Sequence, residues 1–244
     1  ERVRRIMRDY GYRLLAVVDR DGRLLGVIGR SEVLLVSSTK SEALASSIMV
    51  EPPVVLEGNT LVGDAVRKML AVDEWYAPIV EGRIFKSIFG LEDVIEWALK
   101  GEADRRILER TRLEEVMSRN PVTVTPEDTI GKVWRLMMEY RYAGIPVVDS
   151  KGVVVGMITQ YDLLKKGYAR PHLEAERGPG RRPRVRTAMT RPCTYLYTWS
   201  TLLEAATIMV NRNIGRIPVV ESETTRRLVG IVDREDVVKA LLSY

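Results

Sequence analysis

The chain has 244 residues, of which 45% are hydrophobic and 29% charged, and its formal net charge is +5. This composition is typical of globular proteins, and no apolar run approaches the roughly 20 residues that a membrane-spanning helix requires. A single cysteine (Cys193) and a single histidine (His172) exclude a zinc cluster and a disulfide framework, and they disfavour Ser-His-Asp and Cys-His catalysis.

One pattern recurs four times along the chain: an apolar strand, a turn, a second strand and a helix. The four copies read YRLLAVVD at 12–19 with GVIGRSEVL at 26–34, WYAPIV at 75–80 with IFGLEDVI at 88–95, YAGIPVVD at 142–149 with GMITQYDLL at 156–164, and NIGRIPVV at 213–220 with GIVDREDVV at 230–238. An internal period of this kind predicts a repeat architecture, and it favours pockets between repeats over one active site.

The third copy shows the predicted elements most fully. Residues 121–125 alternate as a strand, and Asp128 or Thr129 is expected to cap the helix that follows. That helix should bury four side chains at helical spacing, namely Val133, Leu136, Met137 and Tyr140. The copy ends in a covered strand at 145–148, a turn at 150–152 and a closing helix at 159–166.

Alignment of the copies divides the chain into four repeats and two connections. Residues 2–19 align without a gap onto 132–149, so we expect the first repeat to be N-terminally incomplete, without its opening helix and first strand. The expected segments are repeat one at 1–40, repeat two at 41–100, a linker helix at 101–112, repeat three at 113–167, a basic Gly/Pro/Arg linker at 168–186 and repeat four at 187–244. Because one repeat has too little core to be stable alone, we expect repeats one and two to pair, and repeats three and four likewise.

The motifs G-h-P-V-V-D and G-h-h-T-x-x-D, in which h is an apolar residue, resemble those of the CBS (cystathionine beta-synthase) domain. Two such repeats form a Bateman module, and four in one chain resemble the gamma subunit of AMP-activated protein kinase and its archaeal relatives. The resemblance implies an α+β, α/β-sandwich-like fold in which each repeat is a small sheet with flanking helices. It also implies regulatory binding of AMP, ADP or ATP in clefts between paired repeats, with no catalytic cofactor.

The third copy carries the complete motif as Thr159 and Asp162. The Asp carboxylate can accept hydrogen bonds from both ribose hydroxyls, while the Thr hydroxyl and free helix N–H groups favour a phosphate. Thr194, Tyr195 and Ile214 of the paired repeat are expected to border the same cleft. The alternative is an ordinary threonine cap with an acidic residue in the first helical turn.

The fourth copy keeps Asp236 but has Asp233 where the motif has Thr, which disfavours a polyphosphate. Arg216 precedes Ile217-Pro218, where the resemblance implies an arginine that reaches ligand phosphate, and its planar fork suits that contact. Alternatively, Arg216 is an exposed arginine at a strand edge. The base side of this cleft is expected to be lined by Val122, Thr123, Tyr142 and Ala143.

The first two copies depart furthest from the motif. The second has Gly90 and Asp93, so its ribose carboxylate survives without the Thr hydroxyl. The first has Gly29 and Glu32, whose longer side chain is expected to overreach a ribose. Their clefts are therefore expected to be empty, selective for another ligand or purely structural.

These observations predict a cytoplasmic adenine-nucleotide sensor without enzymatic activity, which signals to an effector protein by shifting the orientation of its repeats. No membrane partner is expected. One alternative is an interaction scaffold with vestigial clefts. Another is nucleic-acid binding through the arginine-rich segment at 177–186, although that segment has no interleaved aromatic residues for base stacking. Closure of the four repeats within one chain and closure in a homodimer both remain open.

Overall fold

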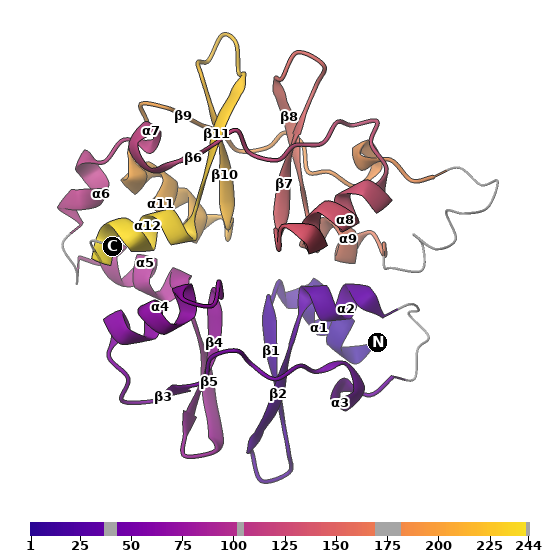
Figure 1. The fold of residues 1–244 in the computed structure, drawn as a ribbon, viewed down its shortest axis with the longest axis vertical. Helices are drawn as coiled ribbons and strands as arrows, with labels where there is room; N and C mark the ends of the chain where they lie inside the picture. Colours follow the sequence, from indigo (N-terminus) through magenta and orange to yellow (C-terminus); the bar gives the residue numbers. More distant parts are fainter. Residues whose placement is uncertain (37–42, 102–104, 169–181, 243–244) are drawn as a thin grey trace.

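The four repeats lie in two pairs that face each other across the centre of the molecule (Figure 1). The structure is a computed structural model that describes residues 1–36, 43–101, 105–168 and 182–242. Repeats one and two form the lower pair in this view, and repeats three and four form the upper pair. The assembly thus closes within a single chain. His172 and part of the arginine-rich segment, 177–181, lie outside the described residues.

The lower pair follows the predicted order of elements. Repeat one contains α1 (Arg2–Tyr10), β1 (Leu14–Val18), β2 (Leu24–Gly29) and α2 (Arg30–Leu35). Repeat two contains α3 (Ala45–Ile48), β3 (Leu56–Glu57), α4 (Val62–Leu70), β4 (Tyr76–Glu81), β5 (Ile84–Gly90) and α5 (Leu91–Leu99). The expected linker helix is the short α6 (Arg106–Arg110).

The upper pair repeats this order. Repeat three contains α7 (Leu113–Val116), β6 (Ser118–Arg119), α8 (Ile130–Glu139), β7 (Gly144–Val148), β8 (Val154–Thr159) and α9 (Gln160–Lys165). Repeat four contains the 3-10 helix η2 (Val185–Thr187), β9 (Leu196–Tyr197), α11 (Leu202–Asn211), β10 (Arg216–Val220), β11 (Leu228–Asp233) and α12 (Arg234–Leu242).

Each repeat is built on one antiparallel hairpin, formed by β1–β2, β4–β5, β7–β8 and β10–β11. Strands β3 and β9 add to their hairpins in parallel at the sheet edge. The strand predicted at 121–125 is reduced to a single bridge between Val124 and Val147. Pro121 has no N–H to donate, and the N–H of Thr125 turns to the Asp128 carboxylate at 2.8 Å, so this segment forms no longer ladder.

Helix α8 is capped by Thr129, whose hydroxyl accepts a hydrogen bond from the N–H of Lys132 at 3.2 Å. Val133 and Met137 are buried as predicted. The prediction that Tyr140 is buried is wrong, because this residue lies just beyond the helix end and is 44% exposed. Its ring stacks on Tyr142 instead, with 5.6 Å between the ring centroids.

The opening segment of one repeat packs against the sheet of its partner. Thr190, which opens repeat four, pairs with Met157 in β8 of repeat three, and Val50 of repeat two pairs with β2 of repeat one. A Cβ on Gly156 would lie 2.9 Å from the Thr190 carbonyl oxygen, and one on Gly26 would lie 2.9 Å from that of Val50. The recurring glycine of the G-h-h-T-x-x-D motif is therefore explained by this close approach of backbones.

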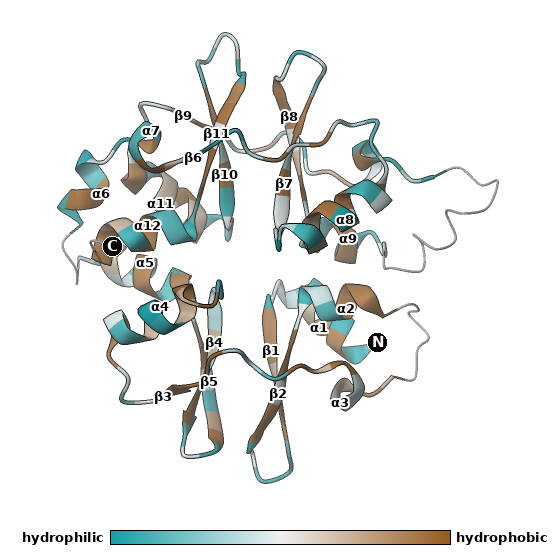
Figure 2. Cartoon of the chain, in the orientation of Figure 1, coloured by the Kyte–Doolittle hydropathy of each residue, from teal (hydrophilic) through white to brown (hydrophobic). Residues whose placement is uncertain are grey.

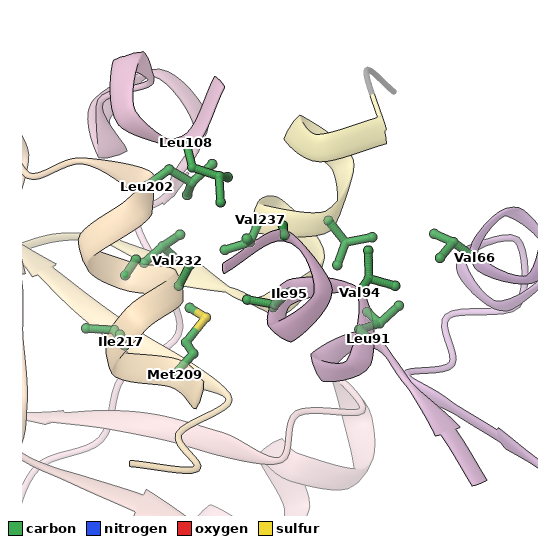
Figure 3. Packing of buried hydrophobic residues seen from close by; sticks show 14 of the residues in the cluster. Val66, Leu91, Val94, Ile95, Leu108, Leu202, Met209, Ile217, Val232 and Val237 are labelled. Atoms are coloured by element: carbon green, nitrogen blue, oxygen red, sulfur yellow. The ribbon is translucent and has the colours of Figure 1, made fainter. Parts of the chain in front are cut away.

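The two pairs meet through their helices. Helix α5 of repeat two packs against α11 and α12 of repeat four, while α2 of repeat one packs against α9 of repeat three. Figure 3 shows side chains of α5, α6, α11 and α12 meeting in one apolar cluster. Strands β1, β2 and β8 are largely hydrophobic, whereas the hairpin turns at the two outer ends are hydrophilic (Figure 2). Burial of the apolar faces of these packed helices holds the two pairs together.

A buried charged side chain crosses this interface. Arg234, at the start of α12, is 1% exposed. Its Nη1 atom lies 2.9 Å from Glu92 Oε2 and donates a 2.6 Å hydrogen bond to the Tyr76 hydroxyl, both in repeat two. Its Nη2 atom donates to Asn213 Oδ1 at 3.3 Å. The buried arginine thus connects repeat four to repeat two.

We expect Arg234→Ala to lower the free energy of unfolding by about 3 kcal/mol, because it leaves Glu92 and the Tyr76 hydroxyl without their partner. Urea unfolding followed by circular dichroism measures this loss. The control is Lys239→Ala, which breaks the exposed pair with Glu235 and should change stability by less than about 0.5 kcal/mol. Equal losses in the two variants would contradict the prediction.

Candidate functional site

The third repeat places its motif where β8 passes into α9. Thr159 caps the helix, and its hydroxyl accepts from the N–H of Asp162 at 3.1 Å. One oxygen of the Asp162 carboxylate accepts from the Thr159 N–H at 2.8 Å and from the Thr159 hydroxyl at 2.6 Å. The other oxygen accepts from the Thr190 hydroxyl of repeat four at 2.8 Å. Residues of both repeats therefore orient the carboxylate, which is 9% exposed.

A cavity of about 380 Å³ lies beside this carboxylate. Thr159 and Asp162 line it from repeat three, and Thr194 and Ile214 line it from repeat four. The opposite pair also contributes, through Gly11, Arg13 and Arg30 of repeat one and Trp75 of repeat two. The volume lies in the range of small-molecule sites, and all four repeats form the walls.

Two arginines of repeat one bring positive charge to this cavity from the opposite pair. Arg13 donates to the backbone oxygen and the side-chain oxygen of Asn213 at 2.9 and 3.0 Å. Arg30 donates to the backbone oxygens of Gly11 and Tyr12. Within the described part of the chain, neither guanidinium forms an ion pair with a carboxylate. Burial lowers the pKa of Arg13, and burial with the nearby charge of Arg13 lowers the pKa of Arg30 to about 10.

This cavity brings together part of the predicted set. Thr194 and Ile214 line it as expected, and so do Ala143 and Arg216, which were predicted for the fourth-repeat cleft. Tyr195 packs elsewhere, with its ring edge-on to Tyr197 at a centroid distance of 6.0 Å. Successive residues of this extended segment point to opposite sides, so Thr194 faces the cavity while Tyr195 covers the hairpins.

Thr190, Arg13 and Arg30 are among the lining residues that were not predicted. Thr190 reaches Asp162 because the opening segment of repeat four packs on repeat three. Arg13 and Arg30 belong to the opposite pair, so their place depends on how the two pairs meet. The motif spacing in one repeat holds no signal for such contacts.

The fourth-repeat position holds an ion pair. Arg216 Nε lies 3.3 Å from Asp233 Oδ2, and the guanidinium lies 4.5 Å from the Tyr142 ring centroid. Asp236 accepts a hydrogen bond from the Asp233 N–H at 2.8 Å. Burial, together with the charge of Asp233, raises the pKa of Asp236 to about 7. Arg216 therefore pairs with Asp233 of the same repeat. Val122 and Thr123 are half-buried in the segment before α8.

In the second repeat, Asp93 accepts a hydrogen bond from the Gly90 N–H at 2.7 Å. Burial raises the pKa of this carboxyl. A Cβ on Gly90 would lie 2.8 Å from a ring carbon of Tyr76 and 2.6 Å from Glu92 Oε2. These two side chains, which also contact Arg234, fill the space that the motif threonine occupies in repeat three.

The first repeat has a cavity of about 520 Å³ beside Glu32, although its motif departs from the pattern. Glu32 Oε2 accepts a hydrogen bond from the Gly29 N–H at 2.7 Å, so the longer acid still caps its helix. A Cβ on Gly29 would lie 2.7 Å from that oxygen, so a threonine here would require the Glu32 side chain to shift. Glu74 also lines this cavity, and Arg141 of repeat three donates to its carboxylate at 2.9 Å.

The residue paired with the motif threonine position differs in every hairpin. The four pairs are Leu14 with Gly29, Tyr76 with Gly90, Gly144 with Thr159 and Arg216 with Asp233. Glycine leaves the third-repeat position open to the cavity, whereas the tyrosine and the arginine extend over their partners in repeats two and four. This cross-strand residue therefore distinguishes the open third-repeat position from the filled positions of repeats two and four.

Among the residues that the structure describes, no group of three or more His, Cys, Asp or Glu side chains is arranged to hold a metal ion. A search of the same residues finds no helix with the length and apolar character needed to cross a membrane.

Comparison with known proteins identifies the repeats. The family model of the CBS domain matches residues 1–38, 45–100, 113–168 and 185–243. The uncharacterized protein MJ1404 of Methanocaldococcus jannaschii is 32% identical over 244 residues, which cover 96% of this chain and 55% of MJ1404. Inosine-5'-monophosphate dehydrogenase of the same organism is 28% identical over 128 residues, which cover 52% of this chain and 23% of the enzyme. The chain thus spans about half of MJ1404 and matches a smaller part of the enzyme.

Solved structures share the whole arrangement. The crystal structure of MJ1225 from M. jannaschii, suggested to be an archaeal homologue of γ-AMPK, has a TM-score of 0.82 at 25% identity and covers 97% of this chain and 91% of that chain. A conserved protein from Pyrococcus horikoshii has a TM-score of 0.66 at 22% identity, with coverage of 94% and 91%, and shows the same fold. The predicted arrangement of four repeats in two paired modules is confirmed.

The pKa of Asp236 predicts a pH dependence of stability. Because its folded value of about 7 lies above that of an unfolded carboxyl, the proton stabilises the folded state below about pH 4, and this contribution is lost as the pH rises through about 7. Asp236→Asn does not ionise, so it should gain about 3 kcal/mol relative to the wild type between about pH 4 and pH 8. Urea unfolding at both pH values measures the gain, and an unchanged difference would contradict the prediction.

Proposed function

The chain belongs to the CBS-domain family as two Bateman modules, and from this premise we propose that it is a sensor that binds an adenine nucleotide in the third-repeat cavity. The ligand is AMP, ADP or ATP. The chain has no catalytic role in this function. Binding of the ligand changes the contacts that the chain makes with an effector protein.

One observation carries the proposal: Arg13 and Arg30 of the first module reach the cavity that holds Thr159 and Asp162 of the second. A ribose placed against Asp162 would donate its hydroxyls to the carboxylate oxygen that now accepts from Thr190. The phosphate would then lie towards the Thr159 hydroxyl and the two guanidinium groups, which form strong charge-assisted hydrogen bonds.

The charge of the cavity favours an anion. Arg13, Arg30 and Arg212 line it, against the single carboxylate of Asp162, while Arg216 at its wall is already paired with Asp233. Burial first, and then the nearby charge of Arg13, lowers the pKa of Arg30, and a phosphate would offset the cost of holding the two half-buried guanidinium groups close together. A nucleotide is therefore favoured over an uncharged nucleoside.

A ligand held by both modules has a direct route to regulation. Its ribose contacts would lie on repeats three and four, and its phosphate contacts on repeat one, so binding would favour one orientation of the modules. The likeness to MJ1225, suggested as a homologue of γ-AMPK, supports a regulatory role of this kind.

The described residues of the basic linker pack against repeat three. Arg186 forms an ion pair with Glu127 at 2.6 Å, and Arg184 donates to the Glu127 backbone oxygen at 2.6 Å, so both hold the linker against repeat three. The scaffold alternative fits repeats two and four, whose motif positions are filled. It does not account for the half-buried arginines around the third-repeat cavity.

Calorimetric titration with AMP, ADP and ATP tests the site. Asp162→Ala should weaken binding roughly tenfold or more, because the ribose loses a charged hydrogen-bond acceptor. Asp93→Ala is the matched control, since this carboxylate caps a helix in the same way but lies where side chains fill the cleft. The control should bind as the wild type does. Equal effects of the two substitutions would contradict the assignment of the ligand to repeat three.

A second titration separates phosphate from nucleoside contacts. Arg30→Ala should weaken AMP binding roughly tenfold or more while leaving adenosine binding nearly unchanged, because the guanidinium contacts only the phosphate. Equal losses for AMP and adenosine would show that Arg30 acts through the fold and not through the phosphate.

A further inference from the structure

Arg216 lies where the fourth-repeat cleft would open. In β10–β11 it is paired with Asp233, as Gly144 is paired with Thr159 in β7–β8. The third-repeat hairpin therefore has no side chain opposite its threonine, whereas the fourth-repeat hairpin has a long cationic one. Asp236 occupies the same capping position as Asp162, so the remainder of the motif is in place.

The surroundings of Arg216 resemble those of a bound cation. Its Nε atom lies 3.3 Å from Asp233, and its guanidinium lies 4.5 Å from the Tyr142 ring of repeat three and 5.5 Å from the Trp75 ring of repeat two. The ion pair is shielded, since the two side chains are 17% and 18% exposed. Three repeats in both modules thus enclose one side chain, which is attracted by both an acid and aromatic faces.

We propose that Arg216 is a built-in occupant of the fourth-repeat cleft, and that residues 216 and 233 make this cleft exclude nucleotides while Gly144 and Thr159 leave the third-repeat cleft open. This assignment rests on the proposed function for the comparison with repeat three. It reverses the role expected of Arg216 from its position in the motif, which was contact with a ligand phosphate.

The exclusion has two causes. A nucleotide entering the fourth-repeat cleft would have to displace a shielded ion pair, which leaves both charges without their partner. Its phosphate would then face the carboxylate of Asp233, whose negative charge repels a phosphate. Loss of Arg216 alone therefore does not create a site, because Asp233 must also be replaced by a neutral hydroxyl residue.

The test transfers the third-repeat pair into the fourth repeat. The variant Arg216→Gly/Asp233→Thr is titrated calorimetrically with AMP beside the wild type. We expect the number of AMP molecules bound per chain to rise by one. The same pair of substitutions is then placed in an Asp162→Ala background, where binding in the third repeat is lost, and saturable binding should return with one AMP per chain. An unchanged number of sites in a cooperatively folded variant would overturn the proposal.

The reciprocal variant keeps the proposal testable if the first fails to fold. Gly144→Arg/Thr159→Asp transfers the fourth-repeat pair into the third repeat. We expect a loss of AMP affinity of roughly tenfold or more with a cooperative thermal transition retained, since the new ion pair fills the cavity. Affinity within about threefold of the wild type would overturn the proposal.

The titrations also separate this inference from the proposed function. If the wild type binds no nucleotide but the variant Arg216→Gly/Asp233→Thr does, the proposed function is overturned and the inference is supported. If the wild type binds one AMP and the folded variant Arg216→Gly/Asp233→Thr still binds only one, the proposed function is supported and the inference is overturned. If neither protein binds AMP, both are overturned.

Discussion

The same hydrogen bond recurs in every repeat, at the junction where the second strand of the hairpin passes into the closing helix. In each repeat the backbone N–H of the junction residue donates to the carboxylate three residues later, at 2.7–2.8 Å. The four acids are Glu32, Asp93, Asp162 and Asp236. This bond holds the chain at a sharp junction. Because the helices pack against the opposite module, the junctions lie near the centre of the molecule. The recurring acid is thus explained by helix capping, and ligand binding would use the lone pairs that the cap leaves free.

In repeats two, three and four, the residue across the hairpin determines whether the junction is filled by side chains or open to a cavity. Tyr76 and Arg216 turn two junctions into points of contact between repeats. Tyr76 contacts Arg234 of repeat four, and Arg216 lies over the rings of Tyr142 and Trp75. Gly144 leaves a junction open, and two arginines of the other module face it. The same scaffold therefore supplies structural sites and a candidate binding site, and the difference between them lies in a few side chains.

The parts of this arrangement that depend on local pattern could be predicted from the sequence. The hairpins, the Thr129 cap, the pairing of repeats and the place of Thr159 and Asp162 all follow from periodicity and motif spacing. The parts that depend on packing at a distance could not. Tyr195 turns away from the cavity, and Arg13 and Arg30 reach it from the other module. Arg216 was placed correctly in its strand, but its partner depended on the cross-strand register.

The central claim is that a nucleotide bridges the two modules at the third repeat while the fourth repeat is filled by its own arginine. A crystal structure of the chain with AMP tests it most directly. The account predicts ribose density at Asp162, phosphate within hydrogen-bond distance of Arg13 or Arg30, and Arg216 still paired with Asp233. Nucleotide density at Asp236 with Arg216 displaced, or a phosphate directed away from the first module, would contradict it.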